Sequence, residues 1–568
     1  MNNGINVTGS AAQCCKMASP RKTQIRISMI SFMFARIRPT QPLLWTVQRL
    51  YSGISSSKKQ EKVSSLLKFF KKTKRRKDLA DPTHPSNVTF LEIRQFLKDF
   101  SCQTHTNITD ADIHNPYDIV KAFLPFQRRH NVIPSVKIRG TSHNGDGLAI
   151  IPKSMYASEY TDSENVLGKY TVLMIPKTAV GDKVKVLLKM HHEFYAEGEL
   201  IEVLNKGSRQ SKRNEQMILC KHFQECNGCQ LQMLSYPEQL LFKQNVIKRA
   251  YQLFYPNLKI DRELGVVNPS PLQYSYRTKL TPHFEVRDGK CTKLGFQHVN
   301  NRGKIDVENC PIATVEINDK LHQARTKYLQ GPPMKQLTLR QSMRIDHDTG
   351  EFYETALEGQ SKVITERIED FIYQFDSNCF FQNNNSVLPS VLDYIRYHMK
   401  QLETPVENVV DTYCGVGFFG IALSNFHEKL NVFGIEISES SIKYANHNMK
   451  LNGLYPERTK FILGDASNIF GNDEFKNSGI KGKGSVVIVD PSRKGSDELF
   501  LKQLLQFEPD MIVYVSCNVF TQARDLANFE ELQGENQKYR VADVVGFDFF
   551  PQTKHVESVA ILKRKLCT

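Results

Sequence analysis

The sequence predicts an α/β protein whose C-terminal part, residues 386–568, is a Rossmann-like doubly wound domain. Apolar runs of strand length recur there, as in GSVVIVDPS and MIVYVSCN, and helix-like segments separate most of them. Such alternation is typical of a parallel sheet buried on both faces. Upstream, short alternating strands predict a small N-terminal β-barrel of the OB type over 131–205, and 206–385 is predicted to be a central α+β domain.

The composition favours a polyanionic partner. The chain has 568 residues, too many for one hydrophobic core, and a formal net charge of +15. Such an excess of Lys and Arg suits nucleic-acid phosphates, although a basic membrane-surface patch would also produce it. No apolar run approaches the roughly 20 residues of a membrane span. The 12 cysteines are unevenly spread, as expected in a reducing compartment. No protein partner is implied.

Residues 1–60 form a basic leader with the make-up of a mitochondrial transit peptide. They contain no Asp or Glu, carry Lys and Arg, and end in Ser-rich sequence. A disordered basic arm is the alternative. Residues 61–130 are predicted to be a basic arm and helical linker, whose run KFFKKTKRRKD suits a nuclear signal or an RNA contact. We expect a mitochondrial protein, and a second pool in the nucleus or cytoplasm is compatible with these features.

The barrel prediction rests on segments such as GDGLAIIP, YTVLMIP and GDKVKVLLKM. These short runs are separated by Gly, Pro and Asp turn signals. A small barrel with lysines along its strands is a common platform for nucleic acid, and a solvated strand face is the alternative. We therefore expect the barrel to bind RNA.

A Gly-rich turn, DTYCGVGFFG, follows the first apolar run of the C-terminal domain. Glycines let a backbone approach a ligand closely at the start of a helix. The next three apolar runs end near Glu436, Asp465 and Asp490. An acid at successive strand ends suits a nucleoside without phosphates, of which S-adenosylmethionine is the common one. A nicotinamide dinucleotide is the second choice, and acids that only cap helices are the structural alternative.

Cys517 ends the fifth apolar run, where it would face the cofactor. A thiolate can add to C6 of a pyrimidine, which makes C5 able to take a methyl group from a sulfonium. A base must then remove the C5 proton. The segment FPQTKHVESVAIL offers Glu557 and His555, which spacing alone leaves nearly tied.

A third cluster, CKHFQECNGC, holds three thiols within ten residues, and a fourth follows in VENCPIA. These are Cys220, Cys226, Cys229 and Cys310. Four thiolates suit zinc or a [4Fe–4S] cluster. Structural zinc sites more often use two close pairs, so the three-plus-one spacing favours iron–sulfur.

Together these residues resemble the RNA uracil-C5 methyltransferase family, and within it the fungal enzymes that make 5-methyluridine at position 54 of tRNA. The resemblance covers residues 131–568. It begins with a TRAM-like barrel (GDGLAII, VGDKVKV) and ends in an S-adenosylmethionine-dependent methyltransferase domain. SCN around Cys517 and HVESV around Glu557 are specific to the family. The resemblance implies that Cys517 is the nucleophile and Glu557 the base.

The resemblance also implies further site residues. Arg277, in YSYRTKL, would lie near substrate. The four cysteines would hold a [4Fe–4S] cluster, with zinc as the alternative. The implied cofactor contacts are Gln382, Tyr413, Glu436 and Asp490. Departures from the family pattern occur at Ser492, Val519 and Asn383, which stand where Pro, Pro and Val are usual, and none removes a proposed catalytic side chain.

The sequence therefore predicts methylation of C5 of a uridine in tRNA, most simply at position 54 in the T loop. The same chemistry on rRNA is the first alternative. The second is an RNA-binding or chaperone protein that needs no catalysis, although such a protein would not require the full set of catalytic side chains.

Overall fold

The structure is a computed structural model that describes residues 81–104, 132–152, 170–191, 195–346, 348–535 and 537–565. Contacts divide the chain into the units Met1–Asp81 and Pro82–Thr568, and every helix and strand described belongs to the second. The predicted leader and most of the basic arm lie outside the described residues. Within those residues, no helix is both long and apolar enough to cross a membrane.

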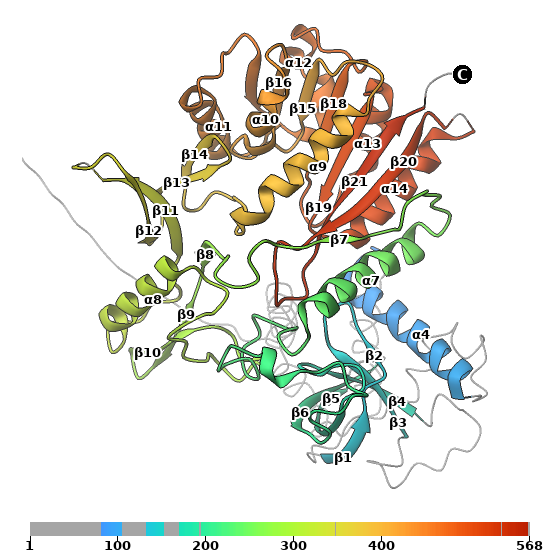
Figure 1. Cartoon of the computed structure of the whole chain (residues 1–568), viewed down its shortest axis with the longest axis vertical. Coiled ribbons are helices and arrows are strands. Elements are labelled where there is room, and N and C mark those ends of the chain that lie inside the picture. Colours follow the sequence, from blue (N-terminus) through green and yellow to red (C-terminus); the bar gives the residue numbers. More distant parts are fainter. Residues whose placement is uncertain are drawn as a thin grey trace, which may run out of the picture. The chain divides into compact units, whose positions relative to one another are not determined.

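An eight-stranded sheet forms the C-terminal part of the fold (Figure 1). The five strands before Cys517 are parallel, as predicted, but β21 runs antiparallel to both β19 and β20, so the complete sheet is mixed. In spatial order the strands are β17 (Thr459–Leu463), β16 (Asn431–Glu436), β15 (Asn408–Asp411), β18 (Ser485–Val489), β19 (Met511–Ser516), β21 (Glu557–Arg564), β20 (Tyr539–Phe547) and β7 (Val267–Asn268).

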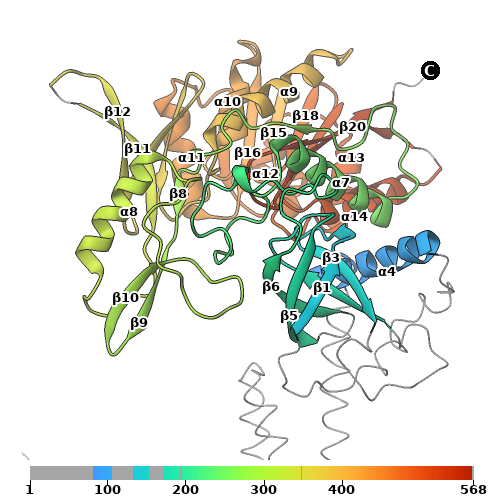
Figure 2. The same cartoon turned by 60° about the horizontal axis from the view of Figure 1, so that its bottom comes forward.

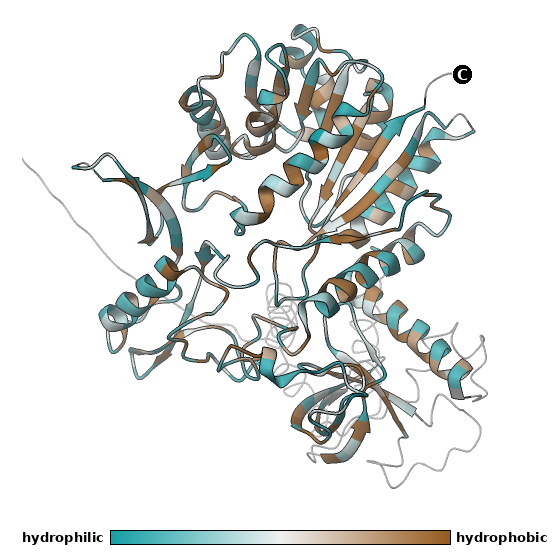
Figure 3. Cartoon of the chain, viewed as in Figure 1, coloured by the Kyte–Doolittle hydropathy of each residue, from teal (hydrophilic) through white to brown (hydrophobic). Residues whose placement is uncertain are grey.

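Both faces of this sheet are buried, because successive side chains point to opposite sides of a strand. Val409 and Ile488 join one apolar cluster, while Val410 and Val487 join another. Apolar residues accordingly follow the strands in Figure 3. The first cluster includes α9 (Leu388–Lys400), α10 (Phe418–Leu423) and α11 (Glu439–Leu451), and the second includes α7 (Tyr236–Phe254), α12 (Asp473–Asn477), α13 (Glu498–Phe507) and α14 (Val519–Gln533). This is the doubly wound arrangement that the sequence predicts.

Two elements from the predicted central domain belong to this layered structure. Strand β7 pairs with the end of β20, and helix α7 packs through Val246, Ile247 and Tyr251 into the cluster that covers the α14 face. The rest of the central part consists of short strands and one helix: β8 (Lys279–Leu280), β9 (His283–Arg287), β10 (Lys290–Gly295), α8 (Val315–Tyr328), β11 (Leu339–Ile345), β12 (Phe352–Glu358), β13 (Val363–Ile368) and β14 (Phe371–Asp376).

The N-terminal strands form a six-stranded sheet of their own, with Ile133, Leu173 and Val184 in its core. Helix α4 (Pro85–Thr104) packs against it through Ile93 and Leu97 (Figure 2). The order of strands is β1 (Val132–Lys137), β5 (Lys183–His191), β6 (Ala196–Val203), β4 (Tyr170–Ile175), β3 (Gly147–Pro152) and β2 (Gly140–Thr141).

The close packing of β16 against β17 predicts a steric effect at Gly434. A Cβ atom added to Gly434 would lie 2.4 Å from Cδ1 of Phe461 and 3.0 Å from Cβ of Cys414. We expect Gly434→Ala to lower the free energy of unfolding by about 1–3 kcal/mol, measured by urea denaturation. Because the cause is contact with Phe461, a smaller side chain at that position should relieve it. The double variant with Phe461→Leu should therefore lose less stability than the sum of the losses in the two single variants. Strict additivity would contradict this explanation.

Candidate active site

The predicted nucleophile and base meet at one edge of the large sheet. Strand β19 ends at Ser516, and the antiparallel strand β21 begins at Glu557. The two strands pair Ser516 with Ser558, so Cys517 and Glu557 each lie one residue from a paired position. Asp490 directly follows β18, the parallel neighbour of β19. The end of one strand and the start of its antiparallel neighbour therefore supply the two reactive groups.

The loop of Cys517 is held by its two polar neighbours, Ser516 and Asn518. The hydroxyl of Ser516 accepts a hydrogen bond from the Asn518 amide at 3.1 Å and donates to the Asn518 carbonyl at 3.0 Å. The Asn518 side chain caps α14 by accepting from the Phe520 amide at 3.3 Å. These bonds fix the turn between strand and helix and leave the Cys517 thiol half-buried.

Burial and clustered charge shift the pKa of each reactive group at this edge. Burial, then the charges of Glu557 and Asp490, raise the pKa of the Cys517 thiol to about 12. Burial raises the pKa of Glu557 to about 7, and burial together with the Glu557 charge raises that of Asp490 to about 8. A carboxyl group with a pKa near 7 can exchange a proton at neutral pH.

Arg493 is a site residue that the sequence reasoning did not single out. Its guanidinium lowers the pKa of both Cys517 and Glu557, against the effect of burial. Its carbonyl accepts hydrogen bonds from the side chains of Asn518 at 3.0 Å and Thr521 at 3.4 Å, which tie its loop to the start of α14. The only sequence signal was its place in DPSRKG, three residues after Asp490.

Glu436 lies at the end of β16 and holds the Gly-rich turn. Its carboxylate accepts hydrogen bonds from the amides of Gly415 at 3.2 Å and Ser438 at 2.8 Å. Gly415 and Gly417 have φ values of 54° and 88°, which favour glycine. Apart from its two chain neighbours, no described residue has an atom within 4 Å of where a Gly415 Cβ would be, so the turn is open on that side. An acid beside an open glycine turn fits a nucleoside ligand.

Asp411 is a second residue that the sequence reasoning missed. It ends β15, is fully buried, and accepts a hydrogen bond from the Gly420 amide at 3.2 Å through one oxygen. Its other oxygen, Oδ1, has no hydrogen-bond partner among the described residues. Burial raises the pKa of Asp411 to about 7. Asp465 differs from these acids, because it is exposed and its carboxylate accepts a hydrogen bond from the Ser467 amide at the start of the following helix. For this residue the structure matches the alternative in which the acid only caps a helix.

The two other predicted cofactor contacts lie near the Gly-rich turn. Tyr413 belongs to the turn, and its half-buried ring lies 5.9 Å from that of Phe500. Gln382 is partly buried and follows Phe381, whose ring lies 5.8 Å from that of Phe418, the first residue of α10. The structure thus places the segment of Gln382 at the helix that follows the turn.

The four predicted metal ligands line a single pocket of about 550 Å³: Cys220, Cys226, Cys229 and Cys310. Among the described residues, no group of three or more His, Cys, Asp or Glu side chains is arranged to hold a metal ion. The pocket also contains buried polar atoms without a hydrogen-bond partner in the described chain, on His222, Gln232 and Asn383. The thiols therefore share a pocket without the geometry of a closed single-ion site.

The other wall of this cysteine pocket is formed by Arg277, Asn383, Thr553 and His555. Desolvation and the neighbouring charges of Lys554 and Arg493 lower the pKa of His555 to about 4. His555 therefore faces the cysteines, whereas it is Glu557 whose charge acts on the Cys517 thiol. This arrangement favours Glu557 over His555 as the base.

Comparison with known proteins agrees with the arrangement. A family model described as tRNA (Uracil-5-)-methyltransferase matches residues 354–565, and a TRAM domain model matches residues 130–201. A Schizosaccharomyces pombe protein named tRNA (uracil(54)-C(5))-methyltransferase is 36% identical over 460 residues, covering 78% of this chain and 80% of its own. A Saccharomyces cerevisiae protein of the same name is 31% identical over 599 residues, covering 95% and 89%.

Among solved structures, the fold is similar to that of the Pyrococcus abyssi tRNA (uracil-54, C5)-methyltransferase in complex with S-adenosyl-L-homocysteine. The TM-score is 0.51 at 22% identity, over 75% of this chain and 99% of the archaeal one. At that identity the likeness concerns the fold alone.

The raised thiol pKa predicts the reactivity of Cys517 towards iodoacetamide. At pH 8 it should be alkylated far more slowly than the exposed Cys102, since little thiolate is present. Glu557→Gln removes a negative charge and should speed alkylation of Cys517, and Arg493→Gln should slow it, each by up to about tenfold per unit of pKa. Mass spectrometry of the two cysteine peptides measures both rates. Equal rates for Cys517 in all three proteins would contradict the electrostatic assignment.

Proposed function

The chain belongs to the tRNA (uracil-5-)-methyltransferase family, and we propose that it transfers a methyl group from S-adenosylmethionine to C5 of uridine 54 in the T loop of tRNA. The observation that carries the proposal is the pairing of Ser516 with Ser558, which brings Cys517 and Glu557 to one sheet edge. A thiol beside a carboxyl group with a pKa near 7 is the pair that C5 methylation of uracil requires.

The reaction uses the two groups in turn. The Cys517 thiolate adds to C6 of uracil, and the C5–C6 π electrons move towards the C4 carbonyl. S-adenosylmethionine supplies the methyl group that the nucleophilic C5 takes up. Glu557 then removes the proton from C5, the C5–C6 double bond re-forms, and the S–C6 bond breaks to release Cys517. Arg493 favours the two ionised states that this sequence needs, the thiolate and the carboxylate.

The cofactor would be held at the Gly-rich turn. Glu436 already orders the turn through Gly415, and the buried Asp411 Oδ1 lacks a partner in the described chain. Tyr413, Gln382 and Asp490 complete the proposed set. The target uridine must leave its stack to reach Cys517, so base flipping is part of the proposal, with the TRAM barrel as the RNA-holding part.

The cysteine pocket is proposed to hold a [4Fe–4S] cluster. A cluster binds each thiolate at a different iron, so its four sulfurs stand farther apart than those around one zinc ion. The support for this proposal is that four thiols, the ligand number of such a cluster, line one pocket of about 550 Å³. The group would brace the segments that form the pocket wall.

Methyl transfer tests the proposed reaction. Labelled methyl should pass from S-adenosylmethionine to an unmodified tRNA transcript as 5-methyluridine, and Cys517→Ala should abolish it. Glu557→Gln should still add to the RNA but release it slowly, so that a covalent protein–RNA species accumulates on denaturing gels. Cys102→Ala is the matched control, because that cysteine is exposed on α4.

Two outcomes would redirect the proposal. If the wild-type protein does not methylate tRNA but methylates rRNA fragments, the assignment of tRNA as the substrate is wrong and the proposed reaction is retained. If wild type binds tRNA but methylates neither RNA, the binding-protein alternative is favoured.

Metal analysis tests the cluster. Protein purified without oxygen should contain about four iron and four sulfide per chain, and Cys226→Ser should lose them. Cys291→Ser is the matched control, because Cys291 is buried outside the pocket and its thiol donates to the Pro332 carbonyl. One zinc per chain, or no metal at all, would contradict the cluster.

A further inference from the structure

Helix α4 packs against two parts of the molecule at once. Val88, in its first turn, joins the apolar cluster that includes Phe520 and the inner face of α7. Ile93 and Leu97, farther along, pack with the barrel residues of a second cluster, Leu148, Val172 and Met174. α4 precedes residue 130, where the TRAM match begins, and it bridges the barrel and the catalytic domain.

The barrel also approaches α4 closely at its backbone. A Cβ atom at Gly140 would lie 3.0 Å from the ring of Phe96. The guanidinium of Arg139 lies 5.6 Å from the ring of Phe100, which in turn contacts Tyr170 edge to face. The contact between helix and barrel is therefore tight along two turns of α4.

Glu92 lies on α4 between these two contacts. Its side chain is only 1% exposed, and it accepts from three donors. The His143 amide donates at 2.9 Å and the His143 ring Nδ1 lies at 2.6 Å, while Arg249 of α7 donates at 2.5 Å. One buried carboxylate thus joins α4, the barrel turn after β2, and α7.

That barrel turn, residues 142–146, contacts both catalytic segments. The ring of His143 lies 5.3 Å from that of Phe520, three residues after Cys517. The side-chain oxygen of Asn144 accepts a hydrogen bond from Lys554 at 2.5 Å, three residues before Glu557. Glu92 holds this turn, and the turn contacts the two segments that carry the nucleophile and the base. The position of the turn therefore affects the position of both segments.

Lys177 of the barrel donates to the carbonyls of Cys226 and Cys229. Ala179 of the barrel shares an apolar cluster with Phe242 of α7.

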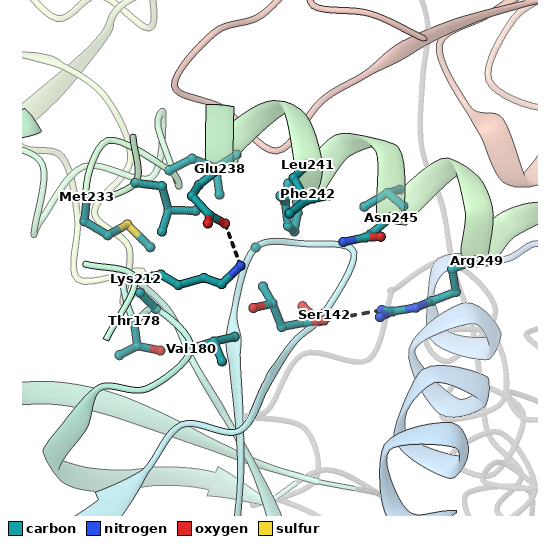
Figure 4. Close-up of a pocket in the computed structure, with 16 residues that line it drawn as sticks. Ser142, Thr178, Val180, Lys212, Met233, Glu238, Leu241, Phe242, Asn245 and Arg249 are labelled. Carbon is teal, nitrogen blue, oxygen red and sulfur yellow. Dashed lines mark hydrogen bonds and ion pairs between the residues drawn. The ribbon is translucent and has the colours of Figure 1, made fainter. Parts of the chain in front are cut away.

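A cavity of about 180 Å³ separates the barrel from α7, and the ion pair between Lys212 and Glu238 crosses it at 2.6 Å (Figure 4). Both of those side chains are at least one-third exposed, so solvent weakens the pair. Arg249 lies at the far end of the same cavity. The polar contacts of Glu92 are therefore the ones that join the barrel turn to both α4 and α7.

We propose that α4 is a clamp that sets the TRAM barrel against the catalytic loops, and that Glu92 is its positioning residue. The clamp holds RNA on the barrel in the one orientation that delivers the target uridine to Cys517. This inference rests on the proposed function and adds to it the element that aligns the substrate. Loosening the clamp lowers the fraction of molecules in the competent orientation, which raises the apparent Kd for RNA by the same factor.

The first test concerns the clamp alone and needs no activity. Glu92→Gln removes the charge at constant shape, and Asp99→Asn makes the same change at an exposed position of the same helix. Hydrogen exchange of the full-length protein should rise in the peptides covering 140–147 and 517–523 in the first variant and not in the second. Unchanged exchange in both variants would overturn the clamp.

The second test concerns alignment of the substrate. Glu92→Gln should raise KM for tRNA about fivefold to tenfold, with kcat within about twofold and the affinity for S-adenosylhomocysteine unchanged. Glu92→Asp, which keeps the charge, should recover part of the loss. An unchanged KM would overturn the positioning role, and so would a parallel loss of S-adenosylhomocysteine affinity, which would mean general unfolding. If wild type does not methylate tRNA, the proposed function fails while the exchange experiment still decides the clamp.

Discussion

The antiparallel pairing of β21 with β19 is the constraint on which the candidate active site depends. In a wholly parallel sheet, every strand start would lie at the edge opposite to the strand ends. Because β21 runs the other way, its first residue, Glu557, lies beside the last residues of β19. The proposed nucleophile and base, which are 40 residues apart in the sequence, therefore become neighbours through backbone hydrogen bonds, before any side chain contributes.

The same burial that makes the sheet stable opposes the chemistry at its edge. Asp411, Asp490 and Glu557 all have raised pKa values because little water reaches them. The charge of Asp490 also raises the pKa of Asp411, and the charge of Glu557 raises that of Asp490. The Cys517 thiol is held neutral for the same reason. Arg493 opposes this trend from an exposed loop, because its charge lowers the pKa of both Cys517 and Glu557.

The sequence patterns predicted the features that depend on neighbouring residues, namely the strands and the residues at their ends. The apolar runs identified the parallel strands, and Cys517 and Glu436 fall at strand ends as expected. The sequence could not indicate that β7 and α7 join the large sheet, because that pairing spans nearly 280 residues and depends on tertiary packing. Arg493 was missed because a basic residue in a polar loop has no distinctive spacing. Asp465 shows the converse, since an acid after a strand can equally well cap the next helix.

The cysteine pocket and the catalytic edge are joined by short stretches of chain, which would give the proposed cluster a structural role. Asn383 in the pocket wall is adjacent to Gln382, and Thr553 and His555 lie within four residues of Glu557. The carbonyl of Gln552 accepts hydrogen bonds from the amides of Gln230 and Leu231, just after the third cysteine of the motif. A group that drew the four cysteines together would therefore fix the loop of the base and the cofactor segment at once. The barrel turn that α4 holds contacts the same loop at Lys554, so the loop of the proposed base would be held from two directions.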